Sequence, residues 1–203
     1  MKYLRRIVIA FLVWTIGGVL LFRFVPVPFT PMMLRYCAGE LFDGRIPSFR
    51  HDWVSLEEID PNLKYAVIAS EDQRFYEHNG FDFKAIEEAM EERRQGKRKR
   101  GASTITQQTA KNVFTFGTST WLRKGIEAYY TVLIELFWSK ERILEVYLNS
   151  IEMGPGIYGV EAVAQEHFNC AASELTRSNC ALIAATLPNP NKFSSKIPSP
   201  YML

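Results

Sequence analysis

The sequence predicts a mainly α-helical protein, in which one apolar N-terminal helix precedes a single helical domain. Three observations support this prediction. Residues 7–22 carry no charge, and such a run is typical of a helix that crosses a membrane. From residue 55 onward, apolar side chains recur at helical spacing behind residues that commonly cap helices. No segment alternates apolar and polar residues well enough to predict a strand.

The composition limits the class of protein. The chain has 203 residues, of which 47% are hydrophobic and 23% charged, and these values exclude a disordered chain. The formal net charge of +2 is too small to indicate a nucleic-acid partner, and none is expected. Three cysteines, Cys37, Cys170 and Cys180, are too few for a disulfide framework. The sequence does not decide between a Cys170–Cys180 disulfide and buried free thiols.

The apolar run Ile7–Phe22 predicts a membrane anchor. As a helix it spans roughly 24 Å, and flanking Arg and Lys side chains can reach the head groups of a ~30 Å hydrocarbon core. A cleaved signal peptide is the alternative, but Arg23–Pro28 offers no small-x-small cleavage site. Positive charge precedes the run, which places the N-terminus in the cytoplasm. We therefore expect residues 1–23 to form a cytoplasmic tip and a single-pass helix in the inner membrane, with the remainder periplasmic.

Residues 24–52 are rich in proline and aromatic residues and are expected to form a juxtamembrane connector. It either lies against lipid or packs as a linker, and the sequence does not decide between the two. Residues 53–203 are expected to form the helical domain.

Most helices of this domain have a recognisable start. Ser55–Glu58 has the pattern of a capping box. Asp60 and Pro61 are typical of the N-cap and first position of the next helix. Later helices are expected to begin behind Asp82, Ser103 and Ser139. Further helices are expected at 121–138, 160–168 and 173–187, with a glycine-rich loop over 154–159.

Glu71 is a candidate general base because it ends an apolar helix. Partial burial raises the pKa of a carboxyl group and makes it a better base near neutrality. Its neighbour Asp72 points about 100° away on a helix, so the two do not form a carboxylate dyad. Both acids are otherwise surface charges or caps. His78 lies between aromatic residues and is expected to be a hydrogen-bonded structural residue, since no histidine has the spacing of a metal ligand.

The segment Gly101–Thr104 is a candidate anion site. Its small residues let a ligand approach the backbone, and a helix beginning at Ser103 presents free N–H groups and the positive end of its dipole. Gln107, Gln108 and Lys111 follow within two turns and can donate hydrogen bonds. A well-capped polar surface helix explains the same pattern, so both interpretations stay open.

Arg123 and Lys124 lie about one helical turn before Glu127. They form either a surface ion pair or a cluster that grips a diphosphate, directly or through a divalent ion. The basic run 97–100 is either a solvated loop or a contact for anionic head groups. A base beside an anion site is suited to displacing a phosphate leaving group.

Taken together, these segments resemble the biosynthetic peptidoglycan glycosyltransferases, the transglycosylases that polymerise lipid II and also occur as one domain of bifunctional penicillin-binding proteins. Five ordered motifs within about residues 53–195 carry the resemblance. In order, they are Glu71-Asp72-x-x-Phe75-x-x-His78-x-Gly80-x-Asp82, Gly101-Ala102-Ser103-Thr104-Ile105-Thr106-Gln107-Gln108 with Lys111-Asn112, Arg123-Lys124-x-x-Glu127, Ser139-Lys140-x-x-Ile143-Leu144-Glu145-x-Tyr147-Leu148-Asn149 with Gly154 and Gly159, and Leu182-Ile183-Ala184 through Leu187-Pro188-Asn189-Pro190. The short chain predicts the monofunctional, membrane-anchored form.

The resemblance implies a lysozyme-like fold with a small membrane-facing jaw lobe. It implies that lipid II is polymerised into β-1,4-linked strands with inversion and release of undecaprenyl diphosphate. Glu71 matches the general base that takes a proton from the acceptor's 4-hydroxyl, and Glu127 matches a second essential acid near the donor's diphosphate. The expected substrate-binding residues are Asp72, Phe75, Ser103, Thr104, Gln107, Gln108, Lys111, Asn112, Arg123 and Lys124.

The expected partners are lipid II, the growing glycan strand, the inner membrane and other cell-wall synthesis proteins. A divalent cation, Mg²⁺ or Mn²⁺, near the diphosphate is the one cofactor considered, with Glu127 as its candidate ligand. Two departures from the family pattern stand out, namely Ala102 for a second glycine and Ser119 where many relatives carry arginine.

Two alternative functions remain. One is a glycan-cleaving lytic transglycosylase or lysozyme-type enzyme, although its substrate has no diphosphate for Lys111, Arg123 and Lys124 to grip. The other is a non-catalytic, membrane-anchored cell-wall scaffold, against which the intact Glu71 and Glu127 argue.

Overall fold

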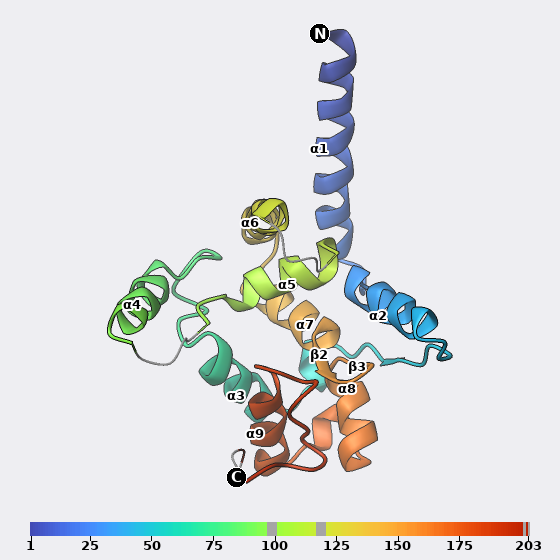
Figure 1. The fold of residues 1–203 in the computed structure, drawn as a ribbon, viewed down its shortest axis with the longest axis vertical. Coiled ribbons are helices and arrows are strands. Elements are labelled where there is room, and N and C mark those ends of the chain that lie inside the picture. The colour runs from blue at the N-terminus through green and yellow to red at the C-terminus, as the bar shows by residue number, and fades with distance from the viewer. Residues whose placement is uncertain (97–100, 117–120, 201, 203) are drawn as a thin grey trace.

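A single long helix projects from the rest of the molecule (Figure 1). The structure, a computed structural model, describes residues 1–96, 101–116, 121–200 and 202. Within these residues, α1 (Lys2–Phe22) is the helix that is long and apolar enough to cross a membrane. Most of its side chains are exposed, with Thr15 and Val19 as its buried residues. The remaining helices gather at its C-terminal end.

The connector predicted for residues 24–52 contains a helix of its own. α2 (Pro31–Phe42) begins behind Thr30, whose hydroxyl accepts a hydrogen bond from the Met33 N–H at 3.2 Å. Thr-Pro is a recognised signal for the start of a helix, and the sequence analysis did not use it. Met33 is buried, whereas Phe42 at the other end of α2 is exposed. The start of the connector helix is therefore packed against the domain, and its end is exposed.

Most of the expected helices form where their caps predict. The helices between the connector and the glycine-rich loop are η1 (Leu56–Glu58), α3 (Pro61–Glu71), α4 (Phe83–Arg94), α5 (Ile105–Phe114), α6 (Trp121–Phe137) and α7 (Lys140–Ser150). Asp60, Asp82 and Ser139 each accept a backbone N–H of the helix that follows.

The prediction that Ser103 caps α5 is wrong, because Thr104 occupies that position. The Thr104 hydroxyl accepts from the Gln107 N–H at 3.1 Å, and the Gln107 side chain accepts from the Thr104 N–H at 3.0 Å. A capping box needs Glu or Gln three residues after the cap. That spacing selects Thr104 with Gln107, since the third residue after Ser103 is Thr106.

The expectation of no strands is also wrong. β1 (Arg50–His51), β2 (Glu152–Gly154) and β3 (Ile157–Tyr158) form a small sheet in the order β1-β3-β2. β3 pairs in parallel with β1 and antiparallel with β2. Strands of two or three residues are too short to show an alternating pattern, and two of them lie where the glycine-rich loop was predicted.

The C-terminal helices differ in part from the prediction. α8 (Val160–Val163) continues into a π-helical turn, η2 (Ala164–Phe168), and together they cover the predicted span. The helix expected at 173–187 is instead a 3-10 turn, η3 (Ala172–Glu174), followed by α9 (Arg177–Thr186). The break occurs because Thr176 caps α9 by accepting from the Asn179 N–H. The three cysteines are free thiols in this structure.

The core of the domain surrounds α7. Most of its side chains from Ile143 onward are buried, including Leu144, Tyr147 and Leu148. α5 packs against both α6 and α7, and α3 packs against α9. Figure 1 shows α5 between α6 above and α7 below. This arrangement places the C-terminal end of α3 beside the N-terminal end of α5. The candidate site lies there.

The apolar helix α1 is docked onto the domain at several points. The hydroxyls of Thr15 and Tyr129 lie 2.8 Å apart, and the Trp138 indole N–H donates to the Val19 carbonyl at 2.7 Å. The Arg142 guanidinium donates to the carbonyls of Phe22 at 2.9 Å and Val25 at 2.7 Å. Because the last carbonyls of a helix lack partners within it, Arg142 satisfies the end of α1 and holds it against α7.

Candidate active site

A cavity of about 1010 Å³ opens between the end of α3, the start of α5, β2 and the loop after α9. Seven of the site residues predicted from the sequence line it. They are Glu71, Asp72, Ser103, Thr104, Gln108, Lys111 and Asn112. We refer to this cavity as the cleft.

Glu71 is the last residue of α3 and is partly buried in the cleft wall. Its carboxylate accepts a hydrogen bond from the Gln108 amide at 2.8 Å. Burial raises the pKa of Glu71, the charge of Asp72 raises it further, and the Gln108 hydrogen bond partly opposes them. Among the described residues no cation pairs with Glu71. This carboxyl therefore has the environment of a general base.

Tyr147 supports this arrangement from below. It is fully buried on α7, and its hydroxyl donates to the Gln108 carbonyl oxygen at 3.3 Å. Burial raises the pKa of Tyr147 well above its ordinary value, so it remains a phenol that can donate. Since the amide oxygen faces Tyr147, the amide nitrogen faces Glu71. Sequence reasoning treated Tyr147 only as an apolar helix residue, although it lies within the fourth motif.

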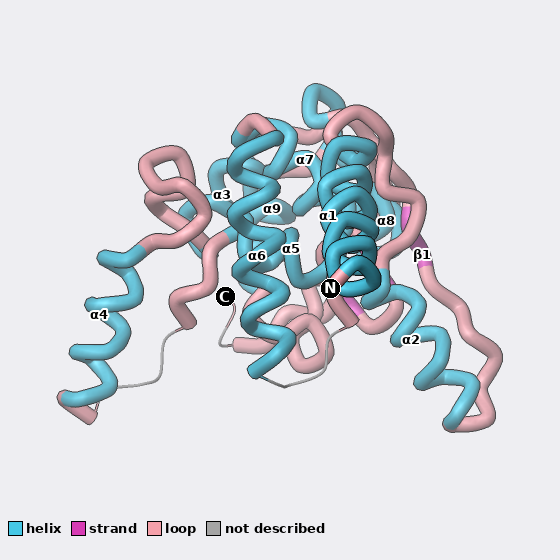
Figure 2. Tube along the Cα trace, turned by 90° about the horizontal axis from the view of Figure 1, so that it is seen from above, coloured by secondary structure: helices cyan, strands magenta, loops and turns pink. Residues whose placement is uncertain are grey.

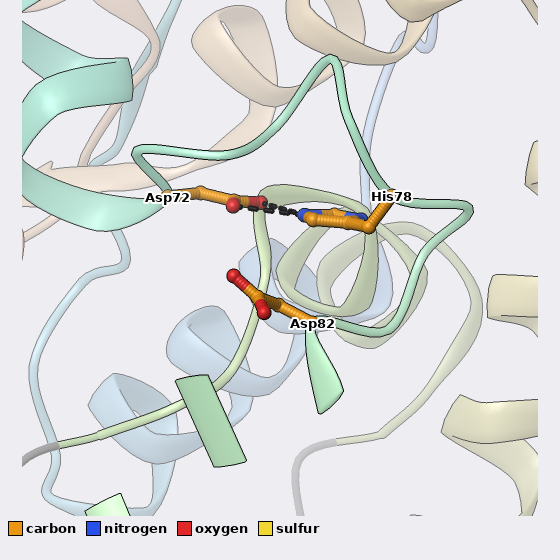
Figure 3. A group of neighbouring side chains, drawn as sticks. All are labelled: Asp72, His78 and Asp82. Carbon is orange, nitrogen blue, oxygen red and sulfur yellow. Dashed lines mark hydrogen bonds and ion pairs between the residues drawn. The ribbon is translucent and has the colours of Figure 1, made fainter. Parts of the chain in front are cut away.

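Asp72 was predicted to bind substrate, but both of its carboxylate oxygens have hydrogen-bond partners within the protein. The Nε2 nitrogen of His78 lies 2.9 and 3.1 Å from them (Figure 3). The Ile105 N–H donates to one of them at 3.0 Å. The histidine is hydrogen-bonded, as predicted. Asp72 thus ties the end of α3 to the first residue of α5.

Asp82 completes a group of three possible metal ligands with Asp72 and His78 (Figure 3). However, the Arg74 guanidinium donates to both Asp82 oxygens, at 2.9 and 3.0 Å, and the Ala85 N–H donates to one of them at 2.9 Å. Every carboxylate oxygen in the group therefore already has a donor. Such a set fits a hydrogen-bonded brace between α3, α4 and α5 better than an ion site.

Lys111 and Asn112 are the donors on the α5 side of the cleft. Burial lowers the pKa of Lys111, as do the nearby charges of Arg123 and Lys124, while Glu127 opposes them. The Asn112 amide nitrogen is buried and finds no acceptor among the described residues. A buried donor without a partner is costly and commonly awaits a ligand. The two side chains suit a phosphate oxygen.

Glu127 on α6 is held by two cations. Its oxygens lie 2.6 Å from the Arg123 guanidinium and 2.6 Å from the Lys124 ammonium. The Glu127 side chain is 3% exposed, whereas that of Lys124 is 50% exposed. These three residues lie beyond the cleft wall, but their charges act on Lys111. Together with Lys111 they form the cation group, which carries three positive charges and one negative.

Two predicted site residues lie elsewhere. Phe75 is fully buried in the core, with the Lys140 ammonium 4.7 Å from its ring centre. Gln107 is used in the capping box of α5. Ser119 and the basic run 97–100 lie outside the described residues.

The cleft thus combines a carboxyl of raised pKa that has no cationic partner among the described residues with a lysine on the same wall, an arrangement typical of an enzyme active site. A family model described as Transglycosylase matches residues 40–200. Biosynthetic peptidoglycan transglycosylases from Bacteroides thetaiotaomicron and Bdellovibrio bacteriovorus are 58% and 53% identical to the chain, covering all of it and 82% and 81% of those proteins. One from Shigella boydii is 48% identical, covering 99% of the chain and 84% of that protein. The chain therefore belongs to the transglycosylase family, and its mostly helical fold is the lysozyme-like fold of that family.

Proposed function

We propose that this peptidoglycan glycosyltransferase polymerises lipid II into β-1,4-linked glycan strands, with inversion and release of undecaprenyl diphosphate. One observation carries the proposal. The cleft holds a carboxyl of raised pKa, Glu71, which accepts a hydrogen bond from a neutral amide, and Lys111 lines the same cleft.

Glu71 acts as the general base. It takes the proton from the acceptor's 4-hydroxyl as that oxygen attacks the anomeric carbon of the donor, and the bond to the diphosphate breaks. Direct displacement at an α-linked donor gives a β-linked product. General base assistance of this kind contributes roughly 10²–10⁴-fold to the rate. Gln108 keeps the carboxylate aimed, because Tyr147 fixes the orientation of the amide.

The leaving group needs charge stabilisation rather than a proton. A glycoside hydrolase must protonate an alkoxide and therefore needs a second carboxyl as acid. A diphosphate leaves readily once its charge is neutralised; Lys111 supplies a donor in the cleft, and the cations on α6 add positive charge beyond its wall. This arrangement favours a glycosyltransferase over a glycan-cleaving enzyme.

A divalent cation, Mg²⁺ or Mn²⁺, beside the diphosphate remains a proposal, with Glu127 as its candidate ligand. Each oxygen of Glu127 already accepts from Arg123 or Lys124 at 2.6 Å. A metal ion would have to replace one of these donors, so the side chains as arranged do not fit a ready ion site. The transfer is accounted for above without a metal-bound step.

We further propose that α1 spans the inner membrane with its N-terminus in the cytoplasm, and that α6 lies in the outer leaflet. The Phe11 and Tyr129 rings lie 5.7 Å apart. At 1.5 Å per residue, Phe11 is about 16 Å along α1 from Phe22, roughly half of a ~30 Å hydrocarbon core. Figure 2 shows α1 and α6 side by side, and α6 exposes apolar side chains including Trp121 and Leu136. The catalytic domain would thus sit partly in the membrane on the periplasmic side, as expected for a jaw lobe.

The decisive experiment is polymerisation of labelled lipid II by the purified chain in detergent. We expect long glycan strands from the wild type and a loss of roughly 10²–10⁴-fold in Glu71→Gln. Glu57→Gln, a neutral replacement on the exposed surface, serves as the matched control and should behave as wild type. Strands made equally well by Glu71→Gln would exclude Glu71 as the base. No strands from the wild type would favour the scaffold, and cleavage of preformed glycan by the same sample would favour a lytic enzyme.

A further inference from the structure

Glu152 is one of six carboxyl residues that line the cleft, and the transfer mechanism does not use it. Glu152 is the first residue of β2 and shares the cavity wall with Lys111 and Tyr158. It is partly buried. An acid on the wall of an anion-binding cleft is unfavourable for anion binding unless it has a task.

The position of Glu152 is fixed by the hairpin that carries it. The Gly156 backbone N–H acts on its carboxyl group and lowers its pKa, although burial raises it more. Gly156 has a φ of 71°, and a Cβ at this position would lie 2.7 Å from the Tyr36 hydroxyl and 3.0 Å from the Ser48 carbonyl oxygen. Because only glycine fits here, the turn is closely packed against α2 and β1. Glu152 is therefore held in place before any ligand arrives.

The charged and titratable groups around Glu152 come from three elements. Lys111 on α5 lowers the pKa of Glu152, but burial raises it more strongly. The Glu152 carboxylate in turn raises the pKa of Tyr36 on α2 and of Tyr158 on β3. Arg35, also on α2, acts on Lys111 and Tyr158.

The charges of Glu152 and Lys111 act on each other at a distance. No ion pair joins them or takes up either group within the described residues. Both groups line the same cavity. An anion bound at Lys111 is therefore exposed to the like charge of Glu152.

We propose that Glu152 is a charge-balancing residue of the anion site, which weakens the grip of Lys111 and the α6 cations on the diphosphate so that the product can leave. The proposal rests on the proposed function, in which the diphosphate binds beside Lys111. Glu127 is already paired with Arg123 and Lys124, whereas Glu152 shares the cleft wall with Lys111 and interacts with its charge. A product held too tightly limits turnover.

The test is a binding measurement that needs no polymerisation. Farnesyl diphosphate is titrated calorimetrically into the full-length chain in detergent, with wild type, Glu152→Gln and Glu152→Asp compared from pH 5 to pH 8. At pH 8 we expect Glu152→Gln to bind on the order of 3- to 10-fold more tightly, because one like charge has gone. Glu152→Asp keeps the charge and should bind as wild type. Lys111→Ala should lose most of the binding.

The pH dependence has a definite sign. Below the pKa of Glu152 its carboxyl is neutral, so wild type and Glu152→Gln should bind equally. As pH rises through that pKa the wild type gains a repelling charge, and the ratio of the two affinities should grow. Ionisation of the probe affects both proteins alike and cancels in the ratio. Equal affinities at every pH, weaker binding by Glu152→Gln, or no binding by the wild type would each overturn the proposal.

Turnover gives a second readout that a merely structural role would not produce. With lipid II, Glu152→Gln should show a lower KM, a lower kcat and stronger inhibition by added farnesyl diphosphate. If Glu152→Gln fails to fold, Glu152→Ala provides a second neutral variant for the same titration. A wild type that binds the probe but makes no glycan would refute the polymerase function while leaving the charge-balancing test intact.

Discussion

Glu71 and Glu127 are both glutamates removed from solvent at helix positions near one cleft, yet their surroundings differ in kind. Glu71 has a neutral amide as its hydrogen-bond partner, and burial raises its pKa. Glu127 has a guanidinium and an ammonium, each at 2.6 Å. A buried carboxyl that lacks a cation holds a proton more readily, as Glu71 does, whereas Glu127 is bound by two charged donors. The partner, more than burial, separates a base from an electrostatic anchor.

The largest effect on stability is expected from neutralising Glu127. Glu127→Gln leaves Arg123 and Lys124 close together beside Lys111 without their acid. Removing one partner of a buried ion pair costs several kcal/mol, and since Lys124 is half exposed we expect a loss of roughly 1–3 kcal/mol in the free energy of unfolding. Urea unfolding in detergent measures it.

Glu127→Asp keeps the charge and is the control, with a smaller loss expected. Activity on lipid II should fall in Glu127→Gln as well. An unfolding free energy equal to that of the wild type would mean that Glu127 does not hold the two cations together.

A smaller effect is expected at the helix that lies between the two acids. Thr104→Ala removes the N-cap of α5 and a hydrogen bond to the Gly80 carbonyl, and should reduce stability by about 1 kcal/mol. Ser103→Ala is the matched control one residue away and should change stability little. Thermal unfolding of both variants decides between the two caps, and a larger loss in Ser103→Ala would contradict the structure.

Neutralising Glu71 should raise the free energy of unfolding, whereas neutralising Glu127 should lower it. Because the pKa of Glu71 is raised in the folded state, its charged form opposes folding. Below its unfolded pKa of about 4.3 the wild type and Glu71→Gln should be equally stable. As pH rises through the folded pKa the wild type loses stability and the variant does not. Unfolding at pH 4 and pH 8 measures this difference, and a variant less stable than wild type at pH 8 would contradict it.

The smallest effect is expected from removing the hydrogen bond that Gln108 donates to Glu71. The Gln108 hydrogen bond lowers the pKa of Glu71, so Gln108→Leu should raise it. Since the base must be ionised, the acid limb of the kcat/KM profile should move to higher pH. Gln107→Leu, which alters only the capping box, is the control and should leave the limb in place while reducing stability. An unmoved limb in Gln108→Leu would show that the amide does not tune the base.

The sequence predicted the parts of the fold that depend on local signals. Caps such as Asp60, Asp82 and Ser139 act on N–H groups two or three residues away, so their helices began where expected. Strand β1 depends on contacts between Arg50 and the distant Gly156 and Ile157, which no local pattern reveals, and β2 and β3 pair locally but are too short to show an alternating pattern. The shift from Ser103 to Thr104 was a matter of choosing between two adjacent hydroxyl residues, and the partner Gln107 was the signal that decides it.

The site was predictable as a set of residues and less so as a geometry. Spacing suggested that Glu71 ends an apolar helix and that Lys111 follows a capped helix start. It did not indicate that Asp72 would turn inward to hold Ile105 and His78, or that Gln107 would fold back onto its own helix. Tyr147 and Glu152 were missed because their roles come from tertiary neighbours, Gln108 for the first and Lys111 for the second.

The clasp of Arg142 and Trp138 on the end of α1 has a consequence for how the enzyme meets its substrate. An anchor on a slack tether would let the cleft sample many heights and tilts above the bilayer. If α1 spans the membrane as proposed, its attachment to α7 leaves rotation about the membrane normal and drift within the plane as the motions of the domain. A lipid-borne sugar diffusing in the same plane then always arrives at one height, and lengthening the chain after Phe24 should slow catalysis by loosening that alignment without altering any residue of the cleft.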